Sequence, residues 1–213
     1  MSRIIMKLVC GLVVAFLLAP FTQSFGQSSR ASFPLAHLTL MGFTLEENTL
    51  SDVEKKLGRS TPGACSEETD ASKMLCYISE AEGAGGTRVI FESGPSGGWS
   101  TLDGFKVASG KMAESCSLQC KKTSAVASDT KTNGGLKLGL TKAELLSLFG
   151  QPTKVDKNRY MFEWSSKRAM TEAELAKFKQ PVEDAYWSVD DTVEVQLSDS
   201  RVIEFEVHHT VLD

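Results

Sequence analysis

Histidine, basic charge and long apolar segments are scarce in this sequence. Its 213 residues include three histidines, and 27 acidic residues outnumber 23 lysines and arginines. A net negative chain lacks the basic footprint typical of proteins that bind nucleic acid or anionic lipid. After the first 26 residues no stretch is apolar enough to cross a bilayer. The composition therefore predicts a mature chain that neither spans a membrane nor binds nucleic acid.

Recognisable catalytic and metal-binding motifs are also missing. Alternation along a regular strand would point His208 and His209 to opposite faces, so they could not chelate one ion together. His37 has no partner of this kind nearby in the sequence. The glycine-rich residues 83–87 and 94–98 lack the strand–helix context of phosphate-binding loops and nucleophile elbows. We expect no catalysis, no cofactor and no metal, which leaves an exported hydrolase or metal-dependent enzyme as the least favoured alternative.

The one long apolar run lies at the start of the chain. Basic residues precede the apolar residues 8–20, and Ser24 and Gly26 stand at −3 and −1 of a cleavage site. This pattern predicts a secretory signal peptide over residues 1–26, with an uncleaved anchor as the alternative. Cys10 lies inside the apolar run, so no lipid anchor is expected. The mature protein is predicted to be periplasmic or secreted.

Four cysteines remain after cleavage. An even number of cysteines in an exported chain predicts two disulfides. Three pairings are possible, and the sequence favours the local one, Cys65–Cys76 with Cys116–Cys120. The alternative is a metal site, because the CxxxC spacing of Cys116 and Cys120 places two thiols one helical turn apart.

A helix signature occurs twice, 92 residues apart, as "TLSDVEKKLGRST" (49–61) and "TKAELLSLFGQPT" (141–153). Each begins with a threonine followed three residues later by an acidic residue, which is the pattern of a capping box. Each ends at a glycine, which favours a left-handed stop. The alignment places Asp52 on Glu144, Leu57 on Phe149, Gly58 on Gly150 and Thr61 on Thr153. Two unrelated helices that end in glycine are the alternative.

Alternating strands follow each helix signature. The expected strands are 74–79, 87–93 and 101–108 after the first helix, and 159–164, 192–197 and 201–209 after the second. Period-2 alternation of this kind predicts antiparallel strands with one covered and one solvated face. We therefore predict an α+β fold of two tandem repeats. Each repeat would be a short helix, or helix pair, packed on one face of an antiparallel sheet of about three to four strands.

This architecture assigns the remaining segments. Residues 27–36 are predicted to be a flexible mature N-terminus, 37–108 the first repeat, 109–135 a Ser/Thr/Gly-rich linker with the CxxxC motif, and 136–213 the second repeat. Within the second repeat, residues 165–187 are predicted to be a helical insertion with a further capping box formed by Thr171 and Glu174.

The segment "GLKLGLTKAELLSLFGQPT" (135–153) resembles the helix–turn signature of outer-membrane assembly lipoproteins of the BamE/SmpA/OmlA type. Two such units in one exported chain resemble the tandem architecture of the beta-lactamase inhibitor protein (BLIP)-like fold. Members of these groups are binding and scaffolding proteins rather than enzymes. The resemblance therefore implies a protein-binding role, or a scaffold in outer-membrane assembly, and it transfers no individual functional residue.

Two sets of residues are candidates for contacting another envelope or extracellular protein. The first is the polar face of the last three strands, namely Glu163, Glu194, Gln196, Glu204 and Glu206, with His208 beside them. If these strands pair, the carboxylates would form a negative patch that could steer a basic partner, although an ordinary solvated sheet face gives the same pattern. Loss of two basic residues with the signal peptide leaves 21 basic against 27 acidic residues, a net charge of −6.

The second set is aromatic. Trp99 and Trp187 lie in expected loops, where tryptophan is enriched as an interface anchor. By contrast, Tyr160, Phe162 and Trp164 share one face of a strand, which favours the core. The sequence predicts an exported protein-binding module whose target and oligomeric state it does not identify.

Overall fold

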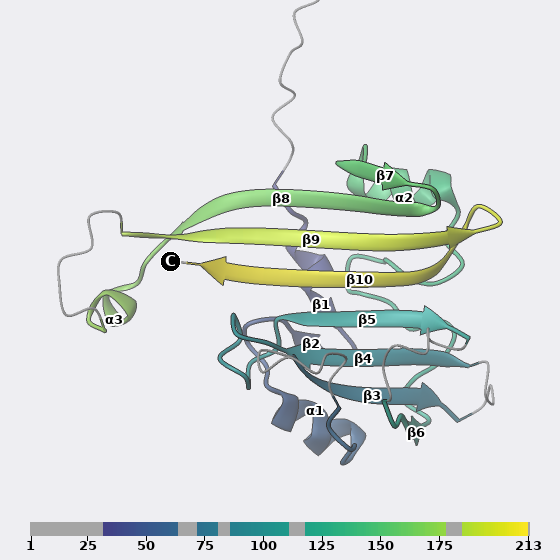
Figure 1. Ribbon diagram of the computed structural model, residues 1–213, viewed down its shortest axis with the longest axis horizontal. Coiled ribbons are helices and arrows are strands. Elements are labelled where there is room, and N and C mark those ends of the chain that lie inside the picture. Colours follow the sequence, from purple (N-terminus) through teal and green to yellow (C-terminus); the bar gives the residue numbers. More distant parts are fainter. Residues whose placement is uncertain (1–31, 64–71, 81–85, 111–117, 178–184, 213) are drawn as a thin grey trace, which may run out of the picture. The chain divides into compact units, whose positions relative to one another are not determined.

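The main feature of the fold is one eight-stranded sheet with the order β6-β3-β4-β5-β10-β9-β8-β7 (Figure 1). The computed structural model describes residues 32–63, 72–80, 86–110, 118–177 and 185–212. The strands of this sheet are β3 (Lys73–Ser79), β4 (Thr87–Ser93), β5 (Gly104–Ser109), β6 (Lys121–Thr123), β7 (Lys154–Asp156), β8 (Arg159–Ala169), β9 (Tyr186–Ser198) and β10 (Arg201–Leu212). Neighbouring strands are antiparallel, except that β6 runs parallel to β3.

In the described part of the chain, four short helical segments and a small hairpin accompany the sheet. They are η1 (Leu35–Leu38), α1 (Leu50–Leu57), α2 (Lys142–Phe149), α3 (Glu172–Leu175), and the hairpin of β1 (Thr39–Leu40) and β2 (Phe43–Thr44). Within the described ranges, no helix has the length and apolar character needed to cross a membrane.

The prediction of two separate helix-on-sheet repeats is wrong. Strand β5, assigned to the first repeat, pairs with β10 of the second from Ala108↔Glu204 to Gly104↔His208. Strands from both halves of the chain therefore form a single sheet with one hydrophobic core. The physical reason is that two small sheets would each leave a long edge strand unpaired, and these two edges satisfy one another's backbone groups.

The helix signatures are confirmed. The side chain of Thr49 accepts a hydrogen bond from the amide of Asp52, and Thr141 accepts one from Glu144, with both carboxylates returning to the threonine amide. The two helices end at glycines with φ of 83° and 74°. The third capping box, between Thr171 and Glu174, is also present and begins α3.

The two ends of the predicted insertion are strand rather than helix. Strand β8 continues to Ala169 and β9 begins at Tyr186, so that residues on both sides of α3 extend one antiparallel ladder. The four-residue α3 is the helical part of this segment that the structure describes. The alternating pattern of β8 weakens after Trp164, where polar side chains follow one another, so this part of the strand has no alternation that would predict it.

The predicted flexible N-terminus and linker both pack against the sheet where they are described. Phe33 is 6% exposed and its ring lies 5.0 Å from that of Trp164. In the linker, β6 pairs with β3, and Val126 and Thr132 are buried. Composition marked these segments as flexible, but their few apolar residues are enough to dock them.

The core lies on one face of the sheet, which we call the inner face. Its largest fully buried side chains include Tyr77, Phe91, Phe105, Phe162 and Phe205. Helix α1 packs on it through Val53 and Leu57, and α2 through Leu145 and Phe149. Tyr160 and Phe162 are buried in this core and Trp164 packs against it, as predicted for the aromatic stripe. The side chains at the alternating positions of β8, β9 and β10 point to the opposite side of the sheet, which we call the outer face.

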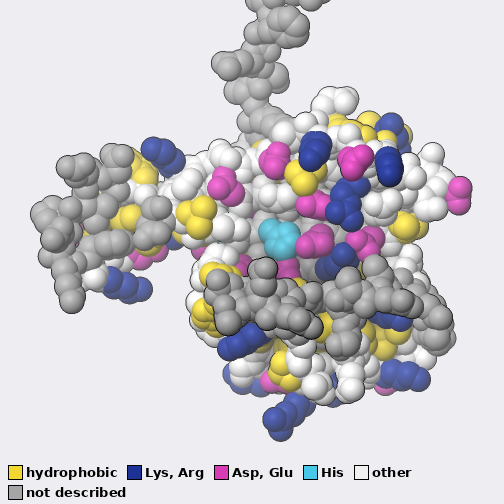
Figure 2. Space-filling model, viewed as in Figure 1, with side chains coloured by type: hydrophobic (Ala, Val, Ile, Leu, Met, Phe, Trp, Pro, Cys, Tyr) yellow, Lys and Arg dark blue, Asp and Glu magenta, His cyan; other side chains and the backbone are white. Residues whose placement is uncertain are grey.

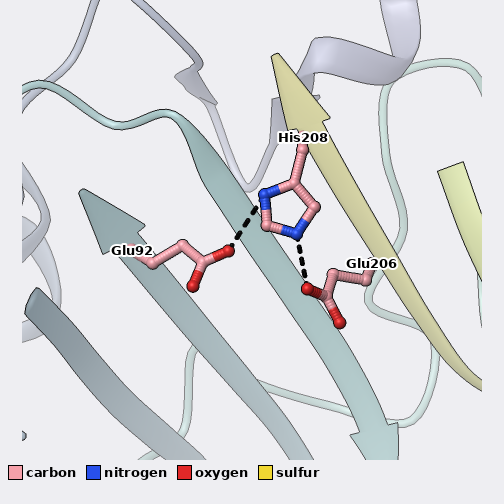
Figure 3. Close-up of side chains that lie close together, drawn as sticks. All are labelled: Glu92, Glu206 and His208. Carbon is pink, nitrogen blue, oxygen red and sulfur yellow. Dashed lines mark hydrogen bonds and ion pairs between the residues drawn. The ribbon is translucent and has the colours of Figure 1, made fainter. Parts of the chain in front are cut away.

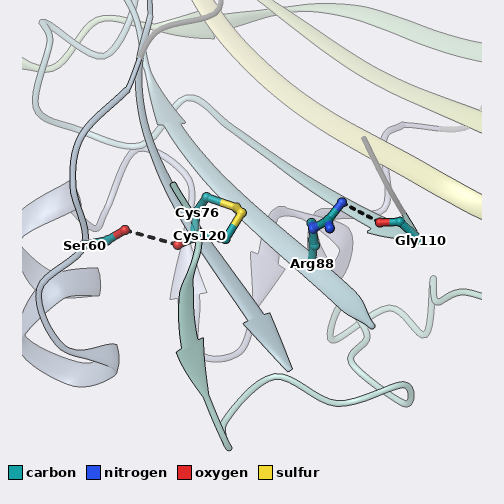
Figure 4. Close-up of a disulfide and its surroundings, with 5 residues drawn as sticks. All are labelled: Ser60, Cys76, Arg88, Gly110 and Cys120. Atoms are coloured by element: carbon teal, nitrogen blue, oxygen red, sulfur yellow. Dashed lines mark hydrogen bonds between the residues drawn. A yellow bond between two sulfur atoms is a disulfide. The ribbon is translucent and has the colours of Figure 1, made fainter. Parts of the chain in front are cut away.

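The predicted local disulfide pairing is wrong, because Cys76 bonds to Cys120 (Figure 4). Strand β6 aligns with β3 so that Lys121 pairs with Tyr77, which brings the two preceding cysteines together. This parallel pairing joins segments 44 residues apart and leaves no local sequence signal. The bond also removes Cys120 from any thiolate site of the CxxxC motif. Cys65 and Cys116 lie outside the described residues.

Candidate functional site

The polar residues predicted on the last three strands share the outer face of the sheet. Glu194 of β9 pairs with Glu206 of β10, and Gln196 pairs with Glu204. Glu163 of β8 lies opposite Thr192 on the same face. Figure 2 shows acidic side chains gathered around a histidine, with lysine and arginine side chains among them.

The carboxylates of this face are partly neutralised by neighbouring cations. Lys106 Nζ of β5 lies 2.7 Å from Glu204 Oε1 and 3.4 Å from Glu206 Oε2. Arg159 lies 3.4 Å from a carboxylate oxygen of Glu194. The surface is therefore a sheet face on which the predicted carboxylates lie among cations of neighbouring strands.

His208 lies between two carboxylates (Figure 3). Its Nδ1 is 3.1 Å from Glu92 Oε1 of β4, and its Nε2 contacts Glu206. Burial alone would lower the pKa of His208, but the hydrogen bond to Glu206 and the charges of both carboxylates raise it to about 9. Burial raises the pKa of Glu92 to about 7, even though His208 opposes this. Burial also acts to raise the pKa of Glu206, but His208 and Lys106 outweigh it and lower the value to about 2.

Gly104 of β5 makes the meeting of Glu92 and His208 possible. It is paired with Glu92 on one side and with His208 on the other. A Cβ atom at this position would lie 2.4 Å from Glu92 Oε1 and 2.6 Å from His208 Nδ1. Because glycine adds no side chain, the carboxylate and the imidazole can approach each other across β5.

His209 forms a second charged cluster on the inner face. Its Nδ1 lies 2.6 Å from Asp191 Oδ1 and its Nε2 lies 3.1 Å from Glu46 Oε2. Burial lowers the pKa of His209, but the hydrogen bonds to Asp191 and Glu46 raise it to about 9. Two hollows of about 320 and 350 Å³ share Glu46 and His209 in their walls. The imidazolium is thus held by a carboxylate at each ring nitrogen.

The other candidate residues lie elsewhere. Trp99 is half-buried in the β4–β5 loop with φ of 64°, and its amide donates to the carbonyl of Gly94. Trp187 of β9 pairs with Arg168 of β8. It is four residues from Asp191 along β9, so both side chains lie on the inner face of the sheet. The two tryptophans are therefore not grouped with the acidic residues. His37 is buried, and burial lowers its pKa to about 4.

Comparison with known proteins adds no relative to this chain. No protein family, curated protein or solved structure matches it. The resemblance to the BamE-type and BLIP-like proteins stays a prediction.

Four members of the two clusters were missed by the sequence analysis. Glu92 and Lys106 belong to strands assigned to the first repeat, so their approach to β10 was not expected. Glu46 lies in a turn with φ of 62° and carried no signal. Asp191 did carry one, because it is a charged residue at a core-facing position between Val189 and Val193.

Proposed function

We propose that the chain is an exported, non-catalytic protein-binding module whose partner docks on the outer face of β8, β9 and β10. The observation that carries this proposal is the exposure of that face. The strands are 11, 13 and 12 residues long. Most of their core-facing side chains are buried, while those on the outer face are partly or fully exposed. A broad sheet face of this kind offers a partner a rigid surface with little ordering cost.

The chemistry of this face favours a partner rich in lysine and arginine. Its carboxylates are Glu163, Asp190, Glu194, Glu204 and Glu206, and its cations are Lys106, Arg159, Lys167 and the His208 ring. The small acidic excess adds to the net negative charge of the whole chain. Complementary charge steers encounter and fixes the register of docking more than it adds affinity.

The disulfide supports export. Disulfides persist in oxidising compartments such as the periplasm and the extracellular space. The Cys76–Cys120 bond therefore supports export behind a signal peptide over residues 1–26. The partner that we propose is accordingly a protein of the bacterial envelope or the extracellular space.

The histidine environments support a role without catalysis. A general base needs a ring nitrogen within reach of a substrate proton. In His208 and His209 each ring nitrogen faces a carboxylate, and His37 is buried with Nδ1 2.9 Å from Thr132 Oγ1. These contacts account for the histidines as charge-paired or core residues.

Charge reversal on the outer face tests the proposal. The double variant Glu163→Lys/Glu194→Lys leaves the His208 cluster intact and places two cations where the partner's cations would dock. We expect a partner captured from envelope extract by the mature chain to bind the variant at least about tenfold more weakly, because like charges across an interface are unfavourable. The measurement is the Kd of the purified pair by calorimetry at low and high salt.

A matched variant controls for charge alone. Glu47 and Glu172 are exposed and lie outside the outer face, so Glu47→Lys/Glu172→Lys makes the same change in net charge elsewhere. It should bind the partner within about threefold of the parent at 0.15 M salt, where distant surface charges are screened. Equal losses in both double variants, or no loss in either, would remove the outer face as the docking site.

A further inference from the structure

One oxygen or nitrogen from each of Glu92, Glu206 and His208 lies within 4.8 Å of the other two. Glu92 comes from β4, whereas Glu206 and His208 come from alternate positions of β10 (Figure 3). The three side chains lean toward one another over β5, which separates the two strands. Glu92 lies at Nδ1 of His208 and Glu206 at Nε2, so an ion bound to one ring nitrogen requires the carboxylate at the other nitrogen to turn toward it.

Glu92 is the least satisfied member of the group. The residue is 8% exposed, and its Oε1 atom is buried without a hydrogen-bond partner. The neighbouring His208 Nδ1 lies 3.1 Å away, at ion-pair distance but without hydrogen-bond geometry. A buried carboxylate oxygen that lacks a hydrogen-bond donor is unfavourable, so a metal ion bound beside this atom in place of the His208 proton would stabilise it.

The surroundings hold the other ligands in place. Glu206 presents Oε1 to His208 and Oε2 to Lys106, so one oxygen is anchored while the other faces the cluster. Anchoring of a ligand's second atom is typical of the residues around metal sites, where it fixes the ligand's orientation. Gly104 keeps the space beneath the cluster clear, since a Cβ there would meet both Glu92 and His208.

We infer that Glu92, Glu206 and His208 bind one divalent transition-metal ion of the zinc type, which ties β4 to β10 across Gly104. One imidazole nitrogen with two carboxylate oxygens is a ligand set that suits Zn²⁺ and its neighbours, whereas Mg²⁺ and Ca²⁺ prefer oxygen alone. Three protein ligands leave a fourth position for water or for an incoming side chain. The inference goes beyond the proposed docking function and does not depend on it.

The test is a titration of the EDTA-treated mature chain with ZnCl₂ in a calorimeter and with CoCl₂ in a spectrophotometer. We expect one ion per chain, and a visible absorption spectrum typical of Co²⁺ with a low coordination number. Changes to residues that only support a ligand typically cost about 10–100-fold in affinity, so loss of a ligand in Glu206→Gln or Glu92→Gln should exceed about 100-fold.

Glu204→Gln is the matched control, because Glu204 lies two residues from Glu206 on the same face and also contacts Lys106, but is outside the ligand set. It should bind Zn²⁺ within about 100-fold of the parent, and His209→Gln should keep one ion per chain because His209 faces the other side of the sheet. Circular dichroism shows whether each variant folds, and Glu92→Gln serves if Glu206→Gln does not. No binding by the parent chain, or equal binding by the ligand and control variants, would overturn the inference and leave the cluster as an ion-paired triad.

Discussion

Removal of the Cys76–Cys120 disulfide is expected to lower the free energy of unfolding by about 4 kcal/mol on the loop-entropy description. The bond joins residues 44 positions apart, so it removes many conformations from the unfolded chain. It also holds the three-residue β6 beside β3, a parallel pairing that is too short to be stable alone. The change is Cys76→Ala/Cys120→Ala, measured by urea denaturation against the parent chain.

The folded state of this double variant should keep the rest of the sheet. Hydrogen exchange is expected to speed up at Lys121–Thr123 and at the facing residues of β3, while β9 and β10 keep their protection. A matched control is Cys65→Ala/Cys116→Ala, which leaves the described bond in place. If non-reducing peptide mapping of the parent chain joined Cys76 to Cys65 instead, the expected loss would not apply and the pairing described here would be wrong.

Local signals predicted the helix boundaries well. Thr49 and Thr141 were identified as caps because the hydroxyl and the acidic partner three residues later need no tertiary contact to form their bonds. The six longer strands were found for a similar reason, since alternation of buried and exposed side chains is read directly from the sequence, whereas the short β1, β2, β6 and β7 were not predicted. Helix caps and strand alternation both depend on interactions and patterns within about ten consecutive residues.

Pairing between distant strands was not predictable in the same way. The apolar positions of β5 fit a short sheet of its own half as well as they fit the pairing with β10. Alternation predicts on which face of a sheet a side chain lies, but it does not predict which strand is the neighbour. For this reason Glu194, Glu204 and Glu206 were placed together, while Glu92 and Lys106, which complete the cluster, were missed.

We call the group of Glu46, Asp191 and His209 the inner cluster. Its signal in the sequence is a polar residue at a core-facing position of a strand. His209 follows the apolar parity of Phe205 and Val207, and Asp191 follows that of Val189 and Val193. Two such residues on strands that a short turn connects are expected to meet, since each would otherwise be buried without a partner. His209 was interpreted as a surface or core residue, because the strand expected over residues 192–197 stops short of Asp191, its partner on β9.

Breaking the inner cluster is expected to cause the other large loss in the free energy of unfolding. Asp191 and His209 are 4% and 7% exposed, so Asp191→Asn leaves a buried imidazolium with Glu46 as its remaining carboxylate. Loss of one partner of a buried ion pair costs about 3–5 kcal/mol, and we expect about 3 kcal/mol here because Glu46 remains. The measurement is urea denaturation at pH 7 with EDTA present, so that no metal contributes.

The same variant has a defined pH dependence. The folded pKa of His209, about 9, lies above its ordinary value of 6.5. Stability from its charged form is therefore complete below pH 6.5 and is lost as the pH rises through about 9. Glu46 acts in the opposite sense, since its pKa is lowered by the hydrogen bond to His209 and its contribution is lost only as the pH falls below 4.5. The charges of Arg168 and Glu174 have smaller effects on the pKa of Glu46, which Arg168 lowers and Glu174 raises.

The difference in unfolding free energy between the parent chain and Asp191→Asn should therefore narrow between pH 7 and pH 10. His208 titrates in both proteins, so its contribution largely cancels in the difference. Asp190→Asn is the control, because Asp190 is the neighbouring carboxylate on the outer side of β9 and contacts the exposed Ser165 hydroxyl. It should change stability by no more than about 0.5 kcal/mol. A penalty for Asp191→Asn that stayed constant from pH 7 to pH 10 would show that His209 does not lose its proton in this range, and would contradict a folded pKa of about 9.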